Sequence, residues 1–209
     1  MLLKNLKLIN ENPIDIKRLT DKLKISELTA KILIHRGITE PIDADLFLNP
    51  HKQKFNDPFL MKGMTEAVAR IFKAIVNHEK IIIYGDYDVD GMSATSILYR
   101  ALQKLNAIVD FYIPDRSEGY GLNENALQKI IEKNFKILIS VDCGITNHKE
   151  INKFKDKIDF IITDHHLPTE PLNDICVIDP HQKDCNYPDK NLCGAGVAFK
   201  LCQALNKNF

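Results

Sequence analysis

Apolar and polar positions follow two alternating patterns from about residue 64 onward. Unbroken apolar runs, which indicate buried strands, occupy residues 80–84, 107–113, 136–141, 158–163 and 175–178. Segments with the helical spacing of apolar residues separate them, at 64–78, 91–105, 123–134, 147–154 and 195–206. Strands that alternate with helices form parallel sheets with helices on both faces, so the pattern predicts a doubly wound α/β domain.

Residues 1–60 have a different pattern, in which short helical stretches are separated by turn residues. Ser26 is placed to cap a helix that stops at Gly37. Thr39 followed by Pro41 opens another helix, which ends near Pro50. We therefore predict a small N-terminal helical subdomain over 1–62 and the α/β domain over 63–209.

Composition places the chain among ordinary globular proteins. Of its 209 residues, 44% are hydrophobic and 27% are charged, and 28 Lys and Arg balance 28 Asp and Glu. A net charge of zero indicates neither a nucleic acid nor an anionic membrane as a partner. No apolar run approaches the roughly 20 residues that cross a bilayer. We expect a cytoplasmic protein without a membrane partner.

The five cysteines form no C-x-x-C pair, which argues against a disulfide framework and a common zinc site. We therefore expect the five cysteines to be reduced thiols. A metal site built from His181, Cys185 and Cys193 is the alternative, although this spacing matches no standard zinc pattern.

Polar motifs directly follow three of the predicted strands. They supply Asp86, Asp88 and Asp90 after the first strand, Asp142 after the third, and Asp164, His165 and His166 after the fourth. In doubly wound sheets, ligands bind beyond the carboxyl ends of the strands. We therefore expect these acids and imidazoles to meet at one edge of the sheet.

Such a cluster of acids predicts a metal site. Neighbouring carboxylates raise one another's pKa unless a cation lies between them, and oxygen ligands with one or two imidazoles suit Mn²⁺ or Mg²⁺. Two such ions can activate a water and stabilise a phosphate with its leaving oxygen, which points to phosphoester hydrolysis. The alternative is a set of solvated turns with helix-capping aspartates and a buried, hydrogen-bonded histidine.

The motifs Asp-Tyr-Asp-Val-Asp-Gly at 86–91, Val-Asp-Cys-Gly at 141–144 and Thr-Asp-His-His at 163–166 resemble those of the DHH phosphoesterases. Further details are similar to the members of that family that degrade single-stranded DNA from 5′ to 3′ in bacterial DNA repair and recombination. These details are Arg116 with Gly-Tyr-Gly-Leu at 119–122, Asp-Pro-His-Gln at 179–182, Gly-Ala-Gly-Val-Ala-Phe at 194–199, Arg-Gly-Ile at 36–38, Phe-Leu-Asn-Pro at 47–50 and Asp-Pro-Phe at 57–59.

The resemblance implies a nuclease with two ions of Mn²⁺ or Mg²⁺. It implies metal ligands at Asp88, Asp90, Asp142 and His165, with Asp86 as a further candidate. By the same resemblance His166 lies beside the scissile phosphate, as electrostatic stabiliser or proton donor. Asp164 then supports an adjacent imidazole, since ligating histidines hydrogen-bond a carboxylate or carbonyl through the other nitrogen.

Four residues are candidates for binding DNA, each with a structural alternative. Arg116 can pair with a phosphate or be a solvated loop residue. Gly194 and Gly196 precede a helix, whose N-terminus can hold a phosphate, or they form a tight turn. Tyr120 can stack on a base. The implied partners are single-stranded DNA and other repair proteins.

The chain also departs from the family. The remaining aspartate ligand of the family, its second catalytic-region domain and an OB-fold have no counterpart before Phe209, so we expect an N-terminal piece of a longer enzyme with weak or absent turnover. Three alternatives stay open. They are another DHH-type nucleotide phosphoesterase, a haloacid-dehalogenase-like phosphatase with Asp88 as nucleophile and Asp90 as acid and base, and a non-catalytic binding module.

Overall fold

The computed structural model describes residues 12–207. Contacts divide the chain into two units, Met1–Phe55 and Asn56–Phe209. The division falls earlier than the boundary predicted after residue 62, because Pro58 and Met61 are buried in the second unit. The predicted limits of the domains stay a prediction.

The first unit contains the helices α1 (Pro13–Leu23), α2 (Glu27–His35) and α3 (Pro41–Leu48), followed by the short helix η1 (Pro50–Lys52). Its core consists of four buried side chains, Leu19, Ala30, Leu33 and Ala44. Ser26 caps α2 as expected, since its hydroxyl accepts the backbone N–H of Thr29 at 3.1 Å. The cap of α3 is Glu40 rather than Thr39, and the Glu40 side chain makes no capping bond.

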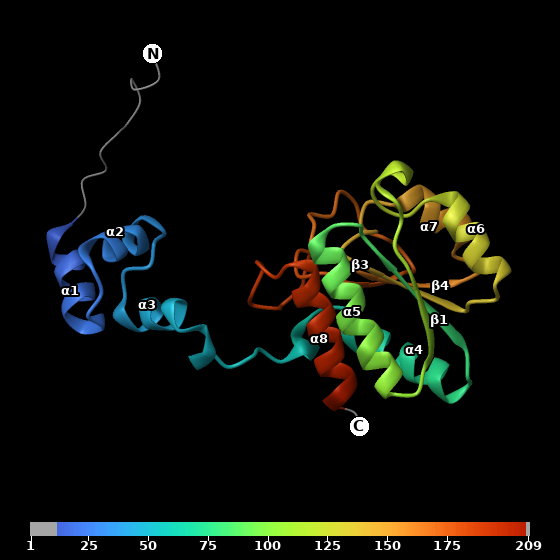
Figure 1. Cartoon of the computed structure of the whole chain (residues 1–209), viewed down its shortest axis with the longest axis horizontal. Helices are drawn as coiled ribbons and strands as arrows, with labels where there is room; N and C mark the ends of the chain where they lie inside the picture. Colours follow the sequence, from blue (N-terminus) through green and yellow to red (C-terminus); the bar gives the residue numbers. More distant parts are fainter. Residues whose placement is uncertain (1–11, 208–209) are drawn as a thin grey trace, which may run out of the picture. The chain divides into compact units, whose positions relative to one another are not determined.

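The second unit is built on a five-stranded sheet (Figure 1). Its strands β1 (Lys80–Gly85), β2 (Ile108–Tyr112), β3 (Ile137–Val141), β4 (Asp159–Thr163) and β5 (Cys176–Ile178) lie in the order β2-β1-β3-β4-β5, and every pair is parallel. The doubly wound α/β fold is therefore confirmed. Each predicted strand is present, and its ends differ from the expected ones by at most two residues.

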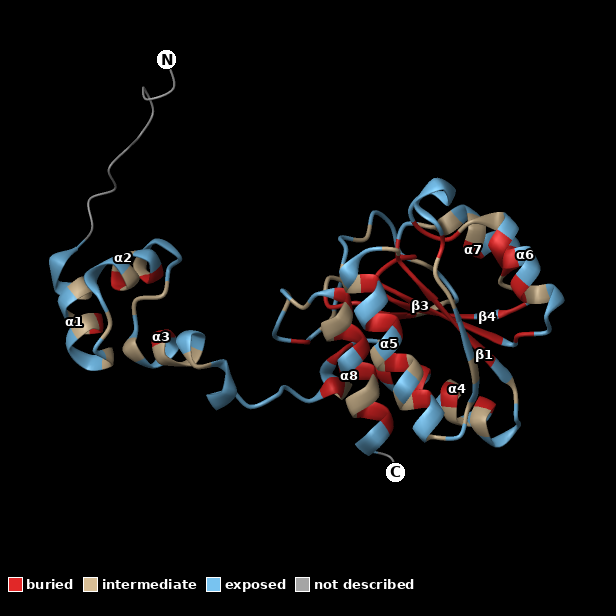
Figure 2. Ribbon diagram, in the orientation of Figure 1, coloured by how far each residue is buried: buried red, intermediate tan, exposed pale blue. Residues whose placement is uncertain are grey.

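Helices cover both faces of the sheet. One face carries α4 (Met64–Val76), α5 (Val89–Lys104) and α8 (Gly194–Lys207), with η2 (Pro58–Leu60), and the other carries α6 (Glu124–Glu132) and α7 (His148–Phe154). A hydrophobic core lies on each face of the sheet, and alternate residues of β1 contribute to one or the other. Ile81 and Ile83 pack toward α4, α5 and α8, while Ile82 and Tyr84 pack toward α6 and α7. Figure 2 shows the central strands as the most deeply buried part of this unit.

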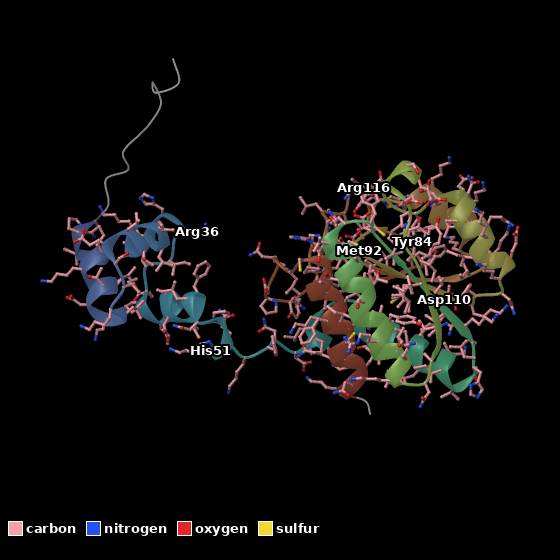
Figure 3. The ribbon with its side chains drawn as sticks, viewed as in Figure 1. Arg36, His51, Tyr84, Met92, Asp110 and Arg116 are labelled. Carbon is pink, nitrogen blue, oxygen red and sulfur yellow. The ribbon has the colours of Figure 1, made fainter. Side chains whose placement is uncertain are left out.

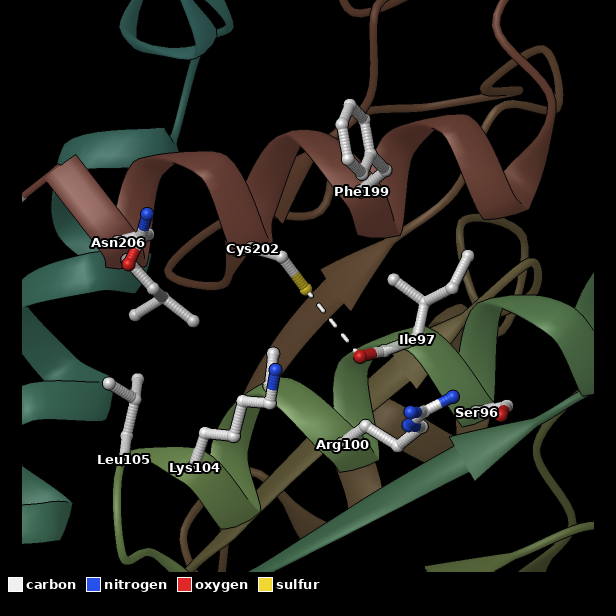
Figure 4. A pocket seen from close by; sticks show the side chains of 10 residues that line it. Ser96, Ile97, Arg100, Lys104, Leu105, Phe199, Cys202 and Asn206 are labelled. Atoms are coloured by element: carbon white, nitrogen blue, oxygen red, sulfur yellow. Dashed lines mark hydrogen bonds between the residues drawn. The ribbon is translucent and has the colours of Figure 1, made fainter.

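Helices α5 and α8 pack against each other, and Cys202 Sγ donates a hydrogen bond to the Ile97 carbonyl at 3.9 Å (Figure 4). The hollow of about 450 Å³ between them is lined by Arg100 and Lys104 and by no carboxylate. Because these residues belong to the C-terminal half of α5, the hollow lies away from the strand ends, and it does not suit a divalent metal ion.

All five cysteines are free thiols. Among residues 12–207, His181, Cys185 and Cys193 do not gather into a group that could hold a metal ion. A search of the same residues finds no helix with both the length and the apolar character needed to span a membrane.

Candidate metal centre

The loop after β1 places two acids in different surroundings. Asp86 is 3% exposed, and its Oδ1 atom is buried without a hydrogen-bond partner. Asp88 is exposed and caps α5, since its Oδ1 accepts the backbone N–H groups of Asp90 at 2.8 Å and Gly91 at 3.0 Å. Gly91 is required here because a Cβ atom would lie 2.6 Å from the Asp86 carbonyl oxygen.

The loop after β3 buries a third acid. Asp142 has a φ of +62° and is 3% exposed, and its backbone N–H donates to the Thr163 carbonyl at 3.0 Å. Helix α8 approaches this side chain so closely that a Cβ atom on Gly194 would lie 2.5 Å from Asp142 Oδ1. Glycine at this position lets the start of α8 pack on the carboxylate.

Two groups of possible metal ligands share this carboxylate. One ligand atom from each of Asp86, Asp88 and Asp142 lies within 4.8 Å of the other two, and the same holds for Asp142, His165 and His166. A carboxylate that belongs to both groups is placed where it can contact two ions.

The electrostatics of the cluster fit a divalent cation. Burial, together with the neighbouring charges of Asp90, Asp88 and Asp164, raises the pKa of Asp142 to about 7. Asp142 Oδ1 and His165 Nε2 lie 3.1 Å apart, yet Oδ1 has no hydrogen-bond partner. A carboxylate oxygen and an imidazole nitrogen at this distance suit two ligands of one ion. Carboxylate and imidazole donors match Mn²⁺ and Mg²⁺.

Asp90 is held differently from the other acids. Its Oδ2 accepts the backbone N–H of Gly194 and its Oδ1 that of Ala195, each at 2.7 Å, while His165 Nε2 lies 3.8 Å from Oδ2. The N-terminus of α8 is thus occupied by a carboxylate of the chain itself. Metal binding by Asp90 and phosphate binding by Gly194 and Gly196 stay predictions. A phosphate at the start of α8 would compete with the Asp90 carboxylate for the N–H groups of Gly194 and Ala195.

The motif after β4 forms a hydrogen-bonded unit around Asp164, which is fully buried. Its Oδ1 accepts the backbone N–H of His165 at 2.7 Å and lies 2.7 Å from His166 Nδ1, and its Oδ2 accepts the backbone N–H of Ile145 at 3.0 Å. Burial lowers the pKa of His166, but the hydrogen bond to Asp164 and the negative charges of Asp164, Asp142 and Asp179 together outweigh it, so the pKa is raised. Asp164 therefore contacts the imidazole of His166, not that of His165.

The loop between β2 and α6 carries two candidate DNA-binding residues. Arg116 lies in the short helix η3 (Arg116–Glu118) and is labelled in Figure 3. Its guanidinium lies 4.8 Å from the centre of the Tyr87 ring. The Tyr120 hydroxyl lies 3.2 Å from both the Asp142 carbonyl oxygen and His166 Nδ1. Tyr120 therefore belongs to the cluster, and half of its surface remains exposed.

Asp179, for which the sequence motifs predict no role, lies beside the site. The residue is fully buried, its Oδ1 accepts the backbone N–H of His181 at 2.6 Å, and its Oδ2 has no partner. Burial raises its pKa to about 7, and Asp164 and His166 are among the charges that act on it. The sequence did contain a signal for Asp179. It directly follows β5, as Asp86, Asp142 and Asp164 directly follow their strands.

Comparison with known sequences agrees with this geometry. Residues 80–209 match the DHH family, N-terminal domain. The single-stranded-DNA-specific exonuclease RecJ of Bacillus subtilis is 50% identical over 193 residues, which are 91% of this chain and 25% of that protein. The chain thus spans about a quarter of the length of this relative.

Comparison with solved structures points to the same relatives. RecJ of Thermus thermophilus in complex with Mn²⁺ matches with a TM-score of 0.74 and 30% identity, over 96% of this chain and 28% of that one. The complex of the same protein with Mg²⁺ matches with a TM-score of 0.61 and 26% identity, over 96% of this chain and 24% of that one. The arrangement of strand-end acids described above therefore lies in a fold shared with metal-bound nucleases.

Proposed function

This chain belongs to the DHH family, and on that basis we propose that its second unit is part of a 5′-to-3′ exonuclease that hydrolyses phosphodiesters in single-stranded DNA. The observation that carries the proposal is the buried carboxylate of Asp142, which two groups of possible metal ligands share. The name of the Bacillus subtilis relative supports the substrate class.

In this proposal Asp86, Asp88 and Asp142 would hold one ion of Mn²⁺ or Mg²⁺, and Asp142 and His165 a second, with Asp90 as a further candidate ligand. Two bound ions supply an activated water and neutralise the charge that develops on the phosphate and its leaving oxygen. The chain's contribution is to keep the unpartnered oxygens of Asp86 and Asp142 together at the carboxyl ends of β1 and β3.

His166 acts on the substrate. The contact of 2.7 Å between its Nδ1 and the Asp164 carboxylate requires a proton on Nδ1, which leaves Nε2 for a phosphate or leaving oxygen. As imidazolium the ring stabilises negative charge or gives up a proton, and the raised pKa favours that form.

Binding of the DNA strand is assigned to residues around this cluster. Arg116 would pair with a phosphate through its planar guanidinium, and Tyr120 offers an exposed ring. Gly194 and Gly196 would approach another phosphate at the start of α8. The wider setting in this proposal is DNA repair and recombination in the cytoplasm, together with other repair proteins.

The phosphatase alternative is less well supported. A haloacid-dehalogenase-like mechanism would use Asp88 as nucleophile, yet Asp88 caps α5 through two backbone N–H groups and the Asp164-His-His166 unit would have no role. The match of residues 80–209 to the DHH family accounts for all three motifs. The alternative of another DHH-type nucleotide phosphoesterase differs from the exonuclease only in the substrate that is hydrolysed.

The test is release of mononucleotides from 5′-labelled single-stranded DNA in Mn²⁺, beside duplex DNA and a dinucleotide as competing substrates. We expect any release from the single strand to be weak and to be abolished by both EDTA and Asp142→Asn. Hydrolysis of the dinucleotide alone would assign the chain to the other DHH phosphoesterases. Release that persists in EDTA would contradict the metal centre.

A further inference from the structure

The loop that leads from β2 to α6 is fixed to the second unit by a buried tyrosine. Tyr84 is fully buried in β1, and its hydroxyl donates to the Gly121 carbonyl at 3.1 Å and accepts from Asn123 Nδ2 at 3.1 Å. Burial raises the pKa of Tyr84, so this hydroxyl keeps its proton and remains a donor. The loop backbone is thereby held at the carboxyl end of β1.

A second anchor comes from the chain after β3. The Asn147 side chain makes two hydrogen bonds with the backbone of Leu122, accepting from its N–H at 3.1 Å and donating to its carbonyl at 3.2 Å. Gly121 has a φ of +86°, and a Cβ atom there would lie 2.6 Å from Asn147 Oδ1. The loop therefore fits against Asn147 only with glycine at this position, and its place is set before any substrate binds.

Tyr120 lies on this anchored loop and bridges two parts of the candidate centre. Its hydroxyl lies 3.2 Å from the Asp142 carbonyl oxygen and 3.2 Å from His166 Nδ1, and its ring meets the His166 ring edge-on with 5.8 Å between centroids. A carbonyl oxygen can only accept, so the Tyr120 proton points to Asp142. The hydroxyl oxygen is then left to accept from the Nδ1–H of His166.

We propose that Tyr120 is a positioning residue for His166, whose Nδ1–H it holds jointly with Asp164 while anchoring itself on the Asp142 carbonyl. The inference rests on the proposed function for the role of His166. The imidazole is restrained on two sides, by a carboxylate at 2.7 Å and by a hydroxyl at 3.2 Å, so Nε2 keeps one direction toward the substrate. Residues that orient metal-ligating histidines typically affect activity by about 10- to 100-fold, and we expect an effect of the same order for His166.

This role differs from stacking on a base, and a single substitution separates the two. Tyr120→Phe removes the hydroxyl and keeps a ring that stacks, whereas Tyr120→Leu removes both. The matched control is Tyr99→Phe on α5, whose ring packs edge-on against Phe111 and not against the metal cluster. All variants are first compared by circular dichroism and by the rise in melting temperature with Mn²⁺.

Two measured quantities, kcat and the exchange rate of the His166 Nδ1–H, are expected to change in Tyr120→Phe. For single-stranded DNA hydrolysis, kcat falls by about tenfold or more while KM and the Mn²⁺-induced rise in melting temperature keep their wild-type values. In the metal-free protein, the ring Nδ1–H of His166 exchanges with solvent several-fold faster by NMR, with His166→Asn used to assign the signal. Tyr99→Phe leaves both readouts unchanged.

Three results would overturn the proposal. Unchanged kcat and unchanged Nδ1–H exchange in Tyr120→Phe would show that the hydroxyl does not restrain His166. Wild-type kcat and KM in Tyr120→Phe, together with a raised KM in Tyr120→Leu, would show that the Tyr120 ring stacks on a base instead. Loss of the Mn²⁺ effect in Tyr120→Phe would show that Tyr120 acts on Asp142. A chain that spans about a quarter of its relative's length can lack turnover, and if wild type releases no nucleotides the exchange measurement alone decides the role of Tyr120. Release that persists in EDTA would contradict the proposed function without touching the exchange result.

Discussion

The carboxylate of Asp90 accepts the backbone N–H of Gly194 at 2.7 Å, so the first turn of α5 is bonded to the first turn of α8. The second oxygen of Asp90 accepts the N–H of Ala195 at the same distance. These two N–H groups are among those that a helix cannot satisfy internally, and the helix dipole adds to the attraction for a negative charge. Asp90 therefore has a structural role besides any role in binding metal.

Replacing Asp90 by alanine tests that structural role. In EDTA we expect Asp90→Ala to lower the free energy of unfolding by about 1 to 2 kcal/mol, because both N–H groups lose their acceptor. Urea denaturation measures the change, and Asp156→Ala, an exposed acid after α7, is the control. If repulsion between Asp90 and the other acids dominated instead, the variant would be more stable than wild type.

The contact between Asp90 and Gly194 shows where sequence patterns stop being informative. The apolar periodicity predicted every strand of the sheet and the helices between them, and the parallel topology explained why acids at strand ends would meet. Nothing in the local pattern says that a residue of α5 caps a helix 104 positions later. That pairing depends on how α5 and α8 pack, which is a tertiary property.

The same reasoning explains two further differences between what the sequence predicts and what the structure shows. The apolar run 107–113 reads like a buried strand, but β2 is an edge strand in which Ile108 and Phe111 are about half exposed. Tyr120 was interpreted from its residue type alone, and its hydroxyl turns out to contact Asp142 and His166 because Tyr84 and Asn147 fix the loop. Strand order and loop position decide these features, and neither follows from periodicity.

Removing the charge of Asp142 should have opposite effects with and without metal. In EDTA at pH 8 we expect Asp142→Asn to be more stable than wild type by about 1 to 2 kcal/mol, because the buried carboxylate with its pKa of about 7 is ionised there at a cost. With Mn²⁺ at about 100 times its dissociation constant, wild type gains about 2.7 kcal/mol and the variant little. The order of the two melting temperatures then reverses.

Calorimetric scans in EDTA, Mn²⁺ and Mg²⁺ measure this reversal. Asp156→Asn is the control, since its exposed side chain belongs to the loop before β4 and joins neither group of possible ligands. Equal metal effects on Asp142→Asn and wild type would place the metal elsewhere in the chain.

Asp179 provides a prediction about pH. Its folded pKa of about 7 lies above the ordinary value of 3.8, so well below pH 3.8 neither state is ionised and the residue costs nothing. As pH rises toward 7 only the unfolded state ionises, so the residue destabilises the fold increasingly, and above pH 7 the full cost is present. We expect the stability of Asp179→Asn relative to wild type to increase by about 2 to 3 kcal/mol from about pH 5 to about pH 8.

Urea denaturation of wild type and Asp179→Asn across this range, in EDTA, gives the comparison. The asparagine keeps an acceptor for the His181 N–H, so the backbone contact is preserved. A stability difference that is constant with pH would mean that the Asp179 carboxyl ionises normally in the folded chain.

Two glycines of the loop between β2 and α6 allow the anchor on Asn147 to be isolated. Gly119 and Gly121 have nearly equal φ values, +87° and +86°, but a Cβ atom meets nothing within 4 Å at Gly119 and lies 2.6 Å from Asn147 Oδ1 at Gly121. Gly119→Ala carries only a backbone cost of about 1 to 3 kcal/mol, because Gly119 has a φ of +87° and a ψ of 176°, a region almost confined to glycine. Gly121→Ala carries a backbone cost of its own and also breaks the hydrogen bonds between Asn147 and Leu122, so we expect an additional cost of about 1 to 3 kcal/mol.

Denaturation of the two single variants measures the difference, and a double-mutant cycle assigns it. In an Asn147→Ala background the obstructing side chain is gone, so Gly121→Ala should cost about 1 to 3 kcal/mol less than in the wild-type background. Because the anchored loop carries Tyr120, Gly121→Ala should also speed Nδ1–H exchange of His166, whereas Gly119→Ala should not. Equal costs for Gly121→Ala in the two backgrounds would show that Asn147 does not hold the loop in place.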